Sequence, residues 1–271
     1  EPLSSLLIDD EDGKRIDPKK IDEVADERVA YVMEKEAQAG IDIANDGEQG
    51  RVGFQTYVPQ RMSGFGGVSS RPYGKEFIEF AKFTERMQAR IPKTSKVFDA
   101  PEAIGELSYR GEAELQKEID RSLRNASNPN AHATERFMNA PSPGVIATTM
   151  MNAYYESDQA YLDAIVREMS KEYRAVVDAG FVLQIDAPDL AMERVLLYQD
   201  LTDAEFAEKV EQHVDALNAA LEGIPRDRVR LHVCWGNWEG PHCYDVAMEV
   251  VLPPIYQAKV GAVGLEFANP R

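Results

Sequence analysis

Two side chains with metal-binding chemistry stand two residues apart in the run Leu231-His232-Val233-Cys234-Trp235. Side chains of a strand alternate between its two faces, so His232 and Cys234 would point to the same side of an extended run. Imidazole and thiolate together suit zinc, and the pair therefore predicts a shared metal ion. The alternative is a buried thiol beside a hydrogen-bonded imidazole, because ligand pairs with so short a spacing recur by chance.

Two other short apolar runs also end with polar residues. Asp186 shares a face with Gln184 at the end of one run, and Glu266 ends another. In a barrel of parallel strands such ends meet at the rim where active sites are built. A lone carboxylate inside a barrel is costly unless it is paired or bound to metal, so Glu266 is a candidate third zinc ligand. The alternative is an ion pair of Glu266 with Arg230 or Arg271.

Further candidate residues lie just beyond predicted strands. Glu48, in the run Asp46-Gly47-Glu48, is placed to bind a substrate amine or to act in acid–base chemistry, although Asp-Gly is also ordinary turn chemistry. Trp235 and Trp238 follow the His-x-Cys pair, and they would either wall off the second substrate or pack in the core.

The remaining histidines carry no strong signal. His242-Cys243 lies in a loop, where a metal-binding role is not expected. His132 and His213 lie among polar residues and are expected at the surface. No Ser-His-Asp or Cys-His nucleophile set is therefore predicted.

Bulk composition limits the partners. The 271 residues include 47 acidic and 30 basic side chains, a formal net charge of −17. Phosphate backbones and anionic membranes attract basic surfaces, so neither nucleic acid nor a membrane is expected as a partner. Two cysteines are too few for a secreted disulfide scaffold, and no apolar run reaches the ~20 residues of a membrane span. No signal peptide is visible, and a cytoplasmic location is expected.

The elements that must position these residues alternate along the chain. Helices are expected over about residues 19–39, 75–90, 112–125, 158–179, 203–222 and 245–259, and strands over 41–44, 102–109, 145–150, 181–186, 229–234 and 260–267. Gly40 and Gly180 are expected to end helices, Thr202 to cap one, and Pro253-Pro254 to break or kink the last.

This alternation without hairpin signals predicts parallel strands joined by crossover helices. The favoured class is α/β, a (β/α)8 TIM barrel, because no Gly-x-Gly-x-x-Gly of an open dinucleotide-binding sheet is present. Six units are visible, so we expect residues 1–271 to form a single barrel catalytic domain that is incomplete at both ends, lacking its first strand and its last βα unit. The Gly- and Ser-rich stretch 57–73 is either a flexible loop or a lid.

Four segments in order resemble the catalytic barrel of the cobalamin-independent methionine synthase family. They are Asp46-Gly47-Glu48, Gln184-Ile185-Asp186-Ala187-Pro188, His232-Val233-Cys234 and Val263-Gly264-Leu265-Glu266. No single motif is specific, but the ordered set is, and it spans the chain from the helix before Gly40 to Arg271. The fold and zinc site also resemble those of epoxyalkane:coenzyme M transferase.

The resemblance implies roles for individual residues. His232, Cys234 and Glu266 would bind zinc, and Glu48 and Asp186 would hold the amino group of homocysteine. The family's last zinc ligand, a cysteine near the end of the barrel, has no counterpart here, and Cys243 stands at the wrong place in the order. The family's Asp-Glu-Pro and Gly-Glu-Pro read Asp-Ala-Pro and Gly-Glu-Gln in this chain, which leaves the identity of the thiol open.

The function expected from this resemblance is zinc-dependent methyl or other alkyl transfer to a thiol, of the 5-methyltetrahydropteroyltriglutamate–homocysteine S-methyltransferase type. Zinc removes the proton of a coordinated thiol, and the thiolate attacks an alkyl carbon of a second substrate, a methylated folate or a corrinoid. The thiol would enter an open zinc position or displace Glu266, while Glu48 and Asp186 orient its polar end. The number of subunits stays open.

Several other functions fit the same residues. One is an epoxide:thiol transferase or C–S lyase of the coenzyme M type. Another is a metal-free lyase or decarboxylase of the same fold, similar to uroporphyrinogen decarboxylase, which would have an arginine-lined pocket. A zinc hydrolase would activate water in place of a thiol. A non-catalytic binding protein would bind a ligand without turnover.

Overall fold

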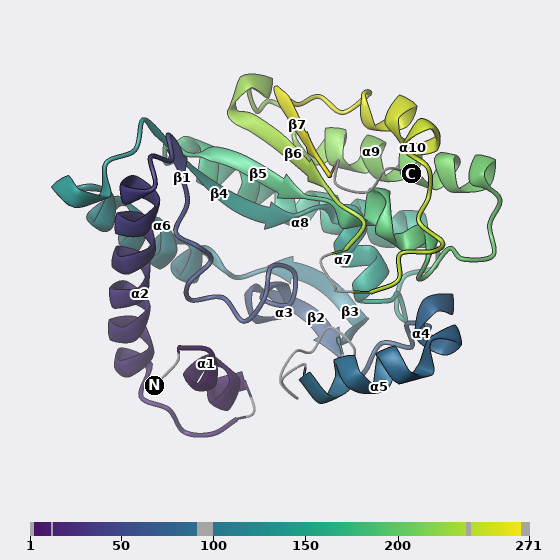
Figure 1. Cartoon of the computed structure of the whole chain (residues 1–271), viewed down its shortest axis with the longest axis horizontal. Coiled ribbons are helices and arrows are strands. Elements are labelled where there is room, and N and C mark those ends of the chain that lie inside the picture. Colours follow the sequence, from purple (N-terminus) through teal and green to yellow (C-terminus); the bar gives the residue numbers. More distant parts are fainter. Residues whose placement is uncertain (1–2, 12, 91–99, 237–239, 267–271) are drawn as a thin grey trace.

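The computed structural model describes residues 3–11, 13–90, 100–236 and 240–266 (Figure 1). Its α-helices are α1 (Leu3–Glu11), α2 (Pro18–Gln38), α3 (Val58–Arg61), α4 (Lys75–Glu79), α5 (Ala81–Arg90), α6 (Glu112–Ala126), α7 (Pro143–Thr149), α8 (Asp158–Asp178), α9 (Asp203–Ala220) and α10 (Met248–Ile255). Its strands are β1 (Ile43–Ala44), β2 (Met62–Gly66), β3 (Glu102–Tyr109), β4 (Glu135–Pro141), β5 (Val182–Asp186), β6 (Val229–Val233) and β7 (Ala262–Leu265).

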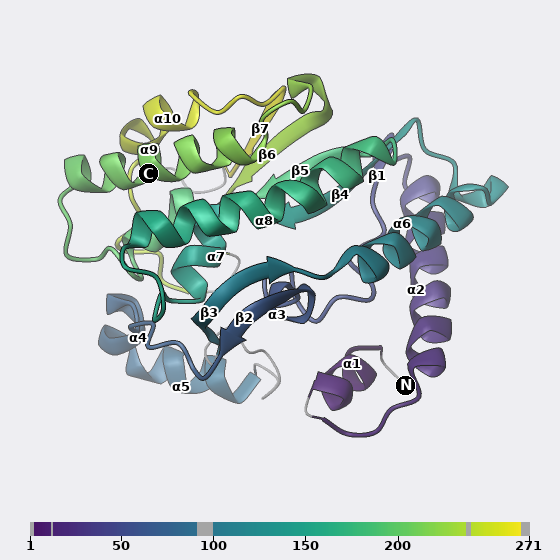
Figure 2. The same ribbon diagram turned by 180° about the vertical axis from the view of Figure 1, so that it is seen from behind.

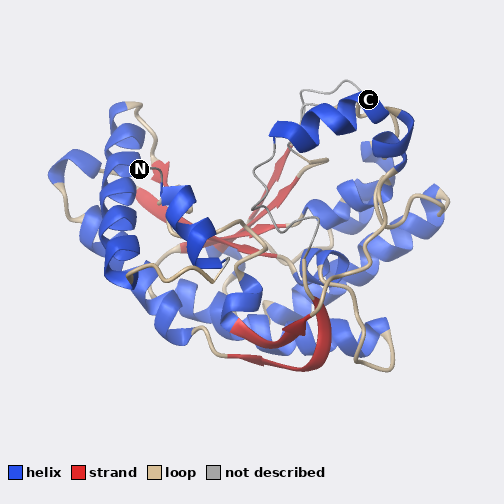
Figure 3. Cartoon of the chain, turned by 90° about the horizontal axis from the view of Figure 1, so that it is seen from below, coloured by secondary structure: helices blue, strands red, loops and turns tan. Residues whose placement is uncertain are grey.

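Five of these strands form one parallel sheet in the order β1-β4-β5-β6-β7. The sheet is curved, and the helices next to its two edges lie on opposite sides of the molecule (Figure 3). The fold is therefore α/β with a curled, half-barrel sheet. The described residues do not close an eight-stranded barrel, because β1 and β7 lie at opposite edges of this sheet.

One face of the sheet is packed against helices. Helices α8 and α9 run along this face (Figure 2), and α8 contacts both β5 and α9. The core beneath them contains the alternate residues of the strands together with helix residues: Leu183, Ile185, Leu231, Val233, Ile165, Met169, Val214 and Leu217. The opposite face carries the polar residues, as the strand period of two requires.

Local signals set the ends of the long helices. The Thr202 hydroxyl accepts a hydrogen bond from the Glu205 backbone N–H at the start of α9, and the Glu205 carboxylate accepts one from the Thr202 backbone N–H, so the predicted cap is confirmed as a full capping box. Gly40 and Gly180 follow α2 and α8 with φ of 75° and 94°, where a side chain would be strained. None of the helices in the described ranges combines the length and apolarity needed to cross a bilayer.

The prediction of a strand over residues 145–150 is wrong. Most of these residues belong to α7. The strand that pairs with β5 is β4, which lies directly before α7 in the sequence. Ser142 caps α7 through the Val145 N–H, and Pro143 occupies the first turn. A cap and a proline at this place favour a helix and outweigh the β-branched residues that suggested a strand.

The expectation of an unbroken βα alternation also fails between β1 and α6. Strands β2 and β3 pair antiparallel and form a separate two-stranded sheet. The pairing shifts register at Gly64 (φ 103°), where an added Cβ would lie 2.7 Å from the Glu106 carbonyl oxygen, so only glycine fits this bulge. Strand β2 and helix α3 lie within the stretch 57–73 that was expected to be a loop.

Two predicted helices are shorter or divided in the structure. The helix expected over 75–90 consists of α4 and α5, which meet at Phe80. The last helix is confined to Met248–Ile255, and Pro253 and Pro254 fall in its final turn. Beyond β2, Arg71 forms an ion pair with the buried Glu193, so the loop before α4 is tied to the segment that follows β5.

Candidate active site at the carboxyl ends of the parallel strands

The register of the sheet places the predicted site residues in adjacent rows. Asp186 on β5 pairs with His232 on β6, and His232 pairs with Gly264 on β7. Register partners in a parallel sheet point to the same side, so Asp186 and His232 are neighbours on the polar face. One row earlier on that face lie Asn139, Gln184 and Arg230.

Asp186 is held in place by two amides. Its Oδ2 accepts a hydrogen bond from Asn139 Nδ2 at 2.9 Å, and its Oδ1 accepts one from Gln184 Nε2 at 2.7 Å. Arg230 donates to Gln184 Oε1 at 2.6 Å and lies 3.7 Å above the centre of the Phe137 ring. Arg230 thus supports Asp186 through Gln184. Arg271, the other cation considered as a partner for Glu266, lies outside the described residues.

Glu48 stands on an unusual turn after β1. Gly47 and Glu48 have φ of 69° and 54°, and the left-handed conformation costs a non-glycine residue roughly 1–2 kcal/mol. The side chain of Asn45 accepts the Gly47 N–H at 2.6 Å, and that of Asp46 accepts the Glu48 N–H at 2.9 Å. These bonds stabilise a strained backbone, which is typical of residues that serve a function.

One oxygen of the Glu48 carboxyl has no hydrogen-bond donor near it among the residues that the structure describes. This oxygen, Oε1, is buried. Burial raises the pKa of Glu48, and the negative charge of Asp186 adds to this rise. The positive charge of Arg51 and a side-chain hydrogen bond from Asn139 oppose it. Glu48 and Asp186 therefore form a pair of neighbouring carboxylates, and the buried oxygen calls for a cationic or donor ligand.

The three proposed zinc ligands lie at the carboxyl ends of two neighbouring strands. His232 lies on β6, Cys234 comes directly after β6, and Glu266 directly after β7. Burial raises the pKa of the Cys234 thiol, and the negative charges of Glu266 and Asp186 raise it further, against a hydrogen bond from the Gly236 backbone. Negative charge thus gathers around the thiol, which a bound cation would relieve.

The donor set fits zinc in kind, since imidazole, thiolate and carboxylate are its usual ligands. Within the described ranges, however, no three His, Cys, Asp or Glu side chains converge closely enough to hold a metal ion. The assignment of His232, Cys234 and Glu266 as zinc ligands therefore stays a prediction.

Trp235 turns inward just after this rim. Its side chain is buried in the main core, and its indole Nε1 donates to the Val246 carbonyl oxygen at 2.9 Å. These contacts are those of a packing residue that also anchors the segment before α10. A role in substrate binding stays a prediction, and Trp238 lies outside the described residues.

His213 was expected at the surface, and this prediction is wrong. The imidazole of His213, on α9, is buried, and its Nδ1 lies 2.8 Å from Asp189 Oδ2. Asp189 also accepts a hydrogen bond from the Ser142 hydroxyl at 2.5 Å. Because the aspartate stands between the serine and the histidine, His213 is not placed to take the Ser142 proton, and the set is not a nucleophile triad.

This cluster leaves no room for a side chain at Gly144. An added Cβ would lie 2.0 Å from Asp189 Oδ2 and 2.5 Å from His213 Nδ1. Gly144→Ala is therefore expected to lower the free energy of unfolding by about 1–3 kcal/mol in urea titrations. Gly105→Ala is the control, since its Cβ would meet only Gly64 at 3.8 Å, and it should stay within about 1 kcal/mol of the wild type. Equal stability of the two variants would contradict the close packing of Asp189 and His213 against Gly144.

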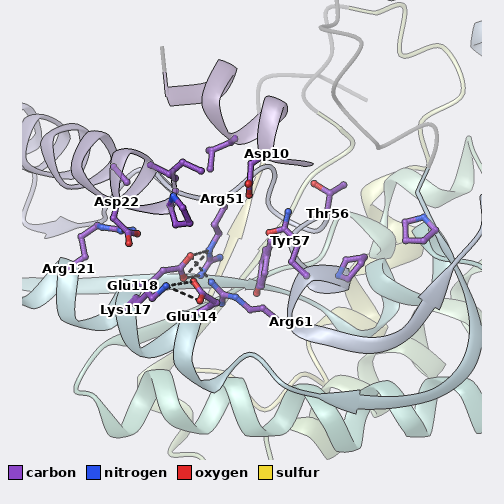
Figure 4. A pocket seen from close by; sticks show the side chains of 18 of the residues that line it. Asp10, Asp22, Arg51, Thr56, Tyr57, Arg61, Glu114, Lys117, Glu118 and Arg121 are labelled. Carbon is purple, nitrogen blue, oxygen red and sulfur yellow. Dashed lines mark hydrogen bonds and ion pairs between the residues drawn. The ribbon is translucent and has the colours of Figure 1, made fainter. Parts of the chain in front are cut away.

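A buried ionic network, which the sequence did not reveal, adjoins the Glu48 turn. Arg51 and Arg61 both pair with Glu118 of α6, at 2.9 and 2.6 Å, and their guanidinium groups lie 4.4 and 4.5 Å from the Tyr57 ring centre. Glu172 of α8 accepts from the hydroxyl of Tyr57 and from Arg61. Arg51, Tyr57, Arg61 and Glu118 line a pocket of about 860 Å³ beside α1 and α2 (Figure 4).

Known proteins resemble this chain in sequence. None of the protein-family models matches it. Methionine synthase from Sulfolobus acidocaldarius is 22% identical over 83% of this chain and 55% of its own length. Methionine synthase from Pyrococcus furiosus is 24% identical over 91% of this chain and 58% of its own length. The chain therefore spans little more than half the length of these relatives.

Solved structures resemble it in fold. A B12-independent methionine synthase from Shewanella sp. W3-18-1, in complex with selenomethionine, superposes with a TM-score of 0.67 at 18% identity, over 94% of this chain and 67% of that one. A putative B12-independent methionine synthase from Listeria monocytogenes gives a TM-score of 0.56 at 15% identity, over 87% and 62% of the two chains. The resemblance to the cobalamin-independent methionine synthases is confirmed.

Proposed function

We propose that this chain, which resembles the cobalamin-independent methionine synthases in sequence and fold, transfers a methyl group to the thiol of an amino acid of the homocysteine type in a zinc-dependent reaction. The observation that carries the proposal is a pair of neighbouring carboxylates: the half-buried Glu48, whose Oε1 is buried, and the buried Asp186. The reaction class comes from the similar proteins, which are methionine synthases. The Shewanella protein is described with selenomethionine, the selenium counterpart of the expected product.

Glu48 and Asp186 would bind the substrate's ammonium group. An ammonium offers three N–H donors, and the free Oε1 of Glu48 supplies an acceptor for one of them. Each oxygen of Asp186 accepts one amide hydrogen and retains a lone pair for another donor. A cation between the two carboxylates would also offset their mutual repulsion, which is large in a buried site.

His232, Cys234 and Glu266 would hold the zinc ion. Zinc in this position would lower the pKa of a coordinated substrate thiol, so that the thiolate, the reactive form, is present at neutral pH. The residues of this chain would orient that thiol: the carboxylates fix the amine end, and the row formed by Asp186 and His232 brings the sulfur end to the rim. Trp235 would help to shield the rim from water.

The remaining partners are proposed to be small molecules. The methyl donor would be a methylated folate or a corrinoid, as the resemblance implies. The curled parallel sheet is proposed to be part of a (β/α)8 barrel, in which the residues named above would line the mouth at the carboxyl ends of the strands.

The experiment that tests this function measures methionine formation from homocysteine and a methylated folate by the zinc-loaded protein. Glu48→Gln and Asp186→Asn are each expected to lower kcat/KM by about 10–100-fold, since a hydrogen bond to a charged group contributes about 1.5–3 kcal/mol. Glu135→Gln is the matched control, because Glu135 begins β4 at the opposite end of the sheet and pairs with Arg228. Unchanged activity in both site variants would refute amine recognition by this pair.

A further inference from the structure

Arg51 is joined to the Glu48 turn and to strand β4 at once. Its backbone N–H donates to the Glu48 carbonyl oxygen at 3.1 Å and closes the turn. Its side-chain Nη1 donates to the Asn139 carbonyl oxygen at 2.6 Å. A single residue thus fixes the position of the strained turn relative to β4.

Asn139 links Arg51 to Asp186 through two hydrogen bonds. Its backbone accepts from Arg51, while its side-chain Nδ2 donates to Asp186 Oδ2 at 2.9 Å. The side chain of Asn45, which also supports the turn, donates to the Phe137 carbonyl oxygen on the same strand at 3.3 Å. The two carboxylates of the proposed amine site therefore share one hydrogen-bonded frame.

The guanidinium of Arg51 is itself immobilised. Nε and Nη2 both donate to the Glu118 carboxylate, at 3.2 and 2.9 Å, in the two-pronged geometry that only arginine offers. The flat group also stacks on Tyr57, whose hydroxyl donates to Glu172. Helices α6 and α8 thereby anchor Arg51, and its side chain is only 5% exposed.

We propose that Arg51 is a positioning residue for amine specificity: it holds Glu48 and, through Asn139, Asp186 at the separation that receives an ammonium group. This inference rests on the proposed function. Among the described residues, the hydrogen bonds and ion pairs of Arg51 go to Glu118, to Asn139 and to the Glu48 turn, not to the metal-ligand candidates. Its loss should therefore affect recognition of the amine more than recognition of the thiol. The positive charge of Arg51 also favours the ionised form of Glu48 by lowering its pKa.

The test compares two thiol acids that differ only in the amine. Binding of homocysteine and of 4-mercaptobutanoate to the zinc-loaded protein would be measured by calorimetry for the wild type and for Arg51→Lys. Lysine keeps the charge but loses the planar fork. We expect the preference for homocysteine to fall by about 10-fold or more, with 4-mercaptobutanoate binding within about two-fold of the wild type.

Arg61→Lys is the matched control. Arg61 stacks on the same tyrosine and pairs with the same Glu118, but its side-chain ion pairs in the described part of the chain are with Glu118 and Glu172 and do not reach the Glu48 turn or Asn139. The preference should therefore be retained in this variant. If Arg51→Lys does not fold, Glu118→Gln, which removes the charged partner of the fork, should reduce the preference in the same way.

The outcomes separate the two proposals. A preference that survives in Arg51→Lys, or an equal loss for both ligands, overturns the role of Arg51 and leaves the proposed function standing. A wild type that binds both thiols equally overturns amine recognition by Glu48 and Asp186, and the role of Arg51 with it.

Discussion

Serine in place of Cys234 is expected, under the proposed function, to prevent zinc binding and to lower methyl transfer by about 10²–10³-fold. A metal ion that acts as a Lewis acid contributes several kcal/mol to catalysis, and each 1.36 kcal/mol corresponds to about a factor of ten in rate. A serine hydroxyl does not ionise near neutral pH and is a poor zinc ligand, whereas thiolate is among the best. Zinc content by elemental analysis and methionine formation would be measured on the same preparations.

The chain offers a matched control in its other cysteine. Cys243 is exposed and follows Cys234 by nine residues, in the segment that leads to α10. Its backbone N–H donates to Glu76 of α4, and its thiol donates to the Pro241 carbonyl oxygen at 3.7 Å, a bond that a serine hydroxyl can also form. Cys243→Ser should keep both zinc and activity. Full zinc content and activity in Cys234→Ser would show that the metal is held elsewhere or that the reaction does not use it.

Elements with complete local signals could be predicted from the sequence. Helices α2, α8 and α9 have apolar residues at helical spacing, caps such as Thr202, and terminal glycines, and all three lie within a few residues of their expected ranges. Strands β5 and β6 could be predicted because alternating apolar and polar residues reflect one packed and one open face.

Elements that depend on distant partners could not be predicted in this way. The pairing of β2 with β3 joins segments about 40 residues apart, and a bulge at a glycine resembles a loop in sequence. The predicted strand over residues 145–150 falls where the structure has α7, and β4 just before it was not predicted. A short strand followed at once by a short helix contains too few residues for the periodicity of either element to be recognised.

The candidate site shows the same division. Residues at strand ends, such as Asp186 and His232, could be placed on one face because strand geometry dictates it. His213 could not, since a histidine on a helix is recognised as buried only when its partner is known, and Asp189 lies 24 residues away. Arg51 was visible in the sequence beside Glu48, but its partner Glu118 comes from a helix 67 residues further along.

Alanine in place of Glu118 is expected to lower the free energy of unfolding by about 3–5 kcal/mol, because removal of one partner leaves buried charges without compensation. Glu118 is the shared partner of two arginines whose side chains are 5% and 6% exposed. Urea titrations monitored by circular dichroism would measure the loss. Glu114→Ala is the control on the same helix: its pair with Lys117 is exposed, and it should cost less than about 1 kcal/mol.

The Glu118 carboxylate should also make the free energy of unfolding depend on pH in the acid range. Burial alone would raise the pKa of Glu118, but the charges and hydrogen bonds of Arg51 and Arg61 outweigh it and lower the pKa from 4.5 to about 2. A pKa that is lower in the folded state contributes stability above about pH 4.5, and this contribution is lost as the pH falls toward 2. The amount at stake is about 3 kcal/mol.

Glutamine at position 118 isolates this contribution, because it keeps the shape of the side chain and does not titrate. Other carboxylates titrate in both proteins, so their effects cancel when the free energy of unfolding of Glu118→Gln is subtracted from that of the wild type at each pH. This difference should be largest above pH 5 and should shrink by about 3 kcal/mol as the pH approaches 2. A difference that stays constant between pH 5 and pH 2.5 would mean that Glu118 is not the ionised centre of the network, and the anchoring of Arg51 would then need another explanation.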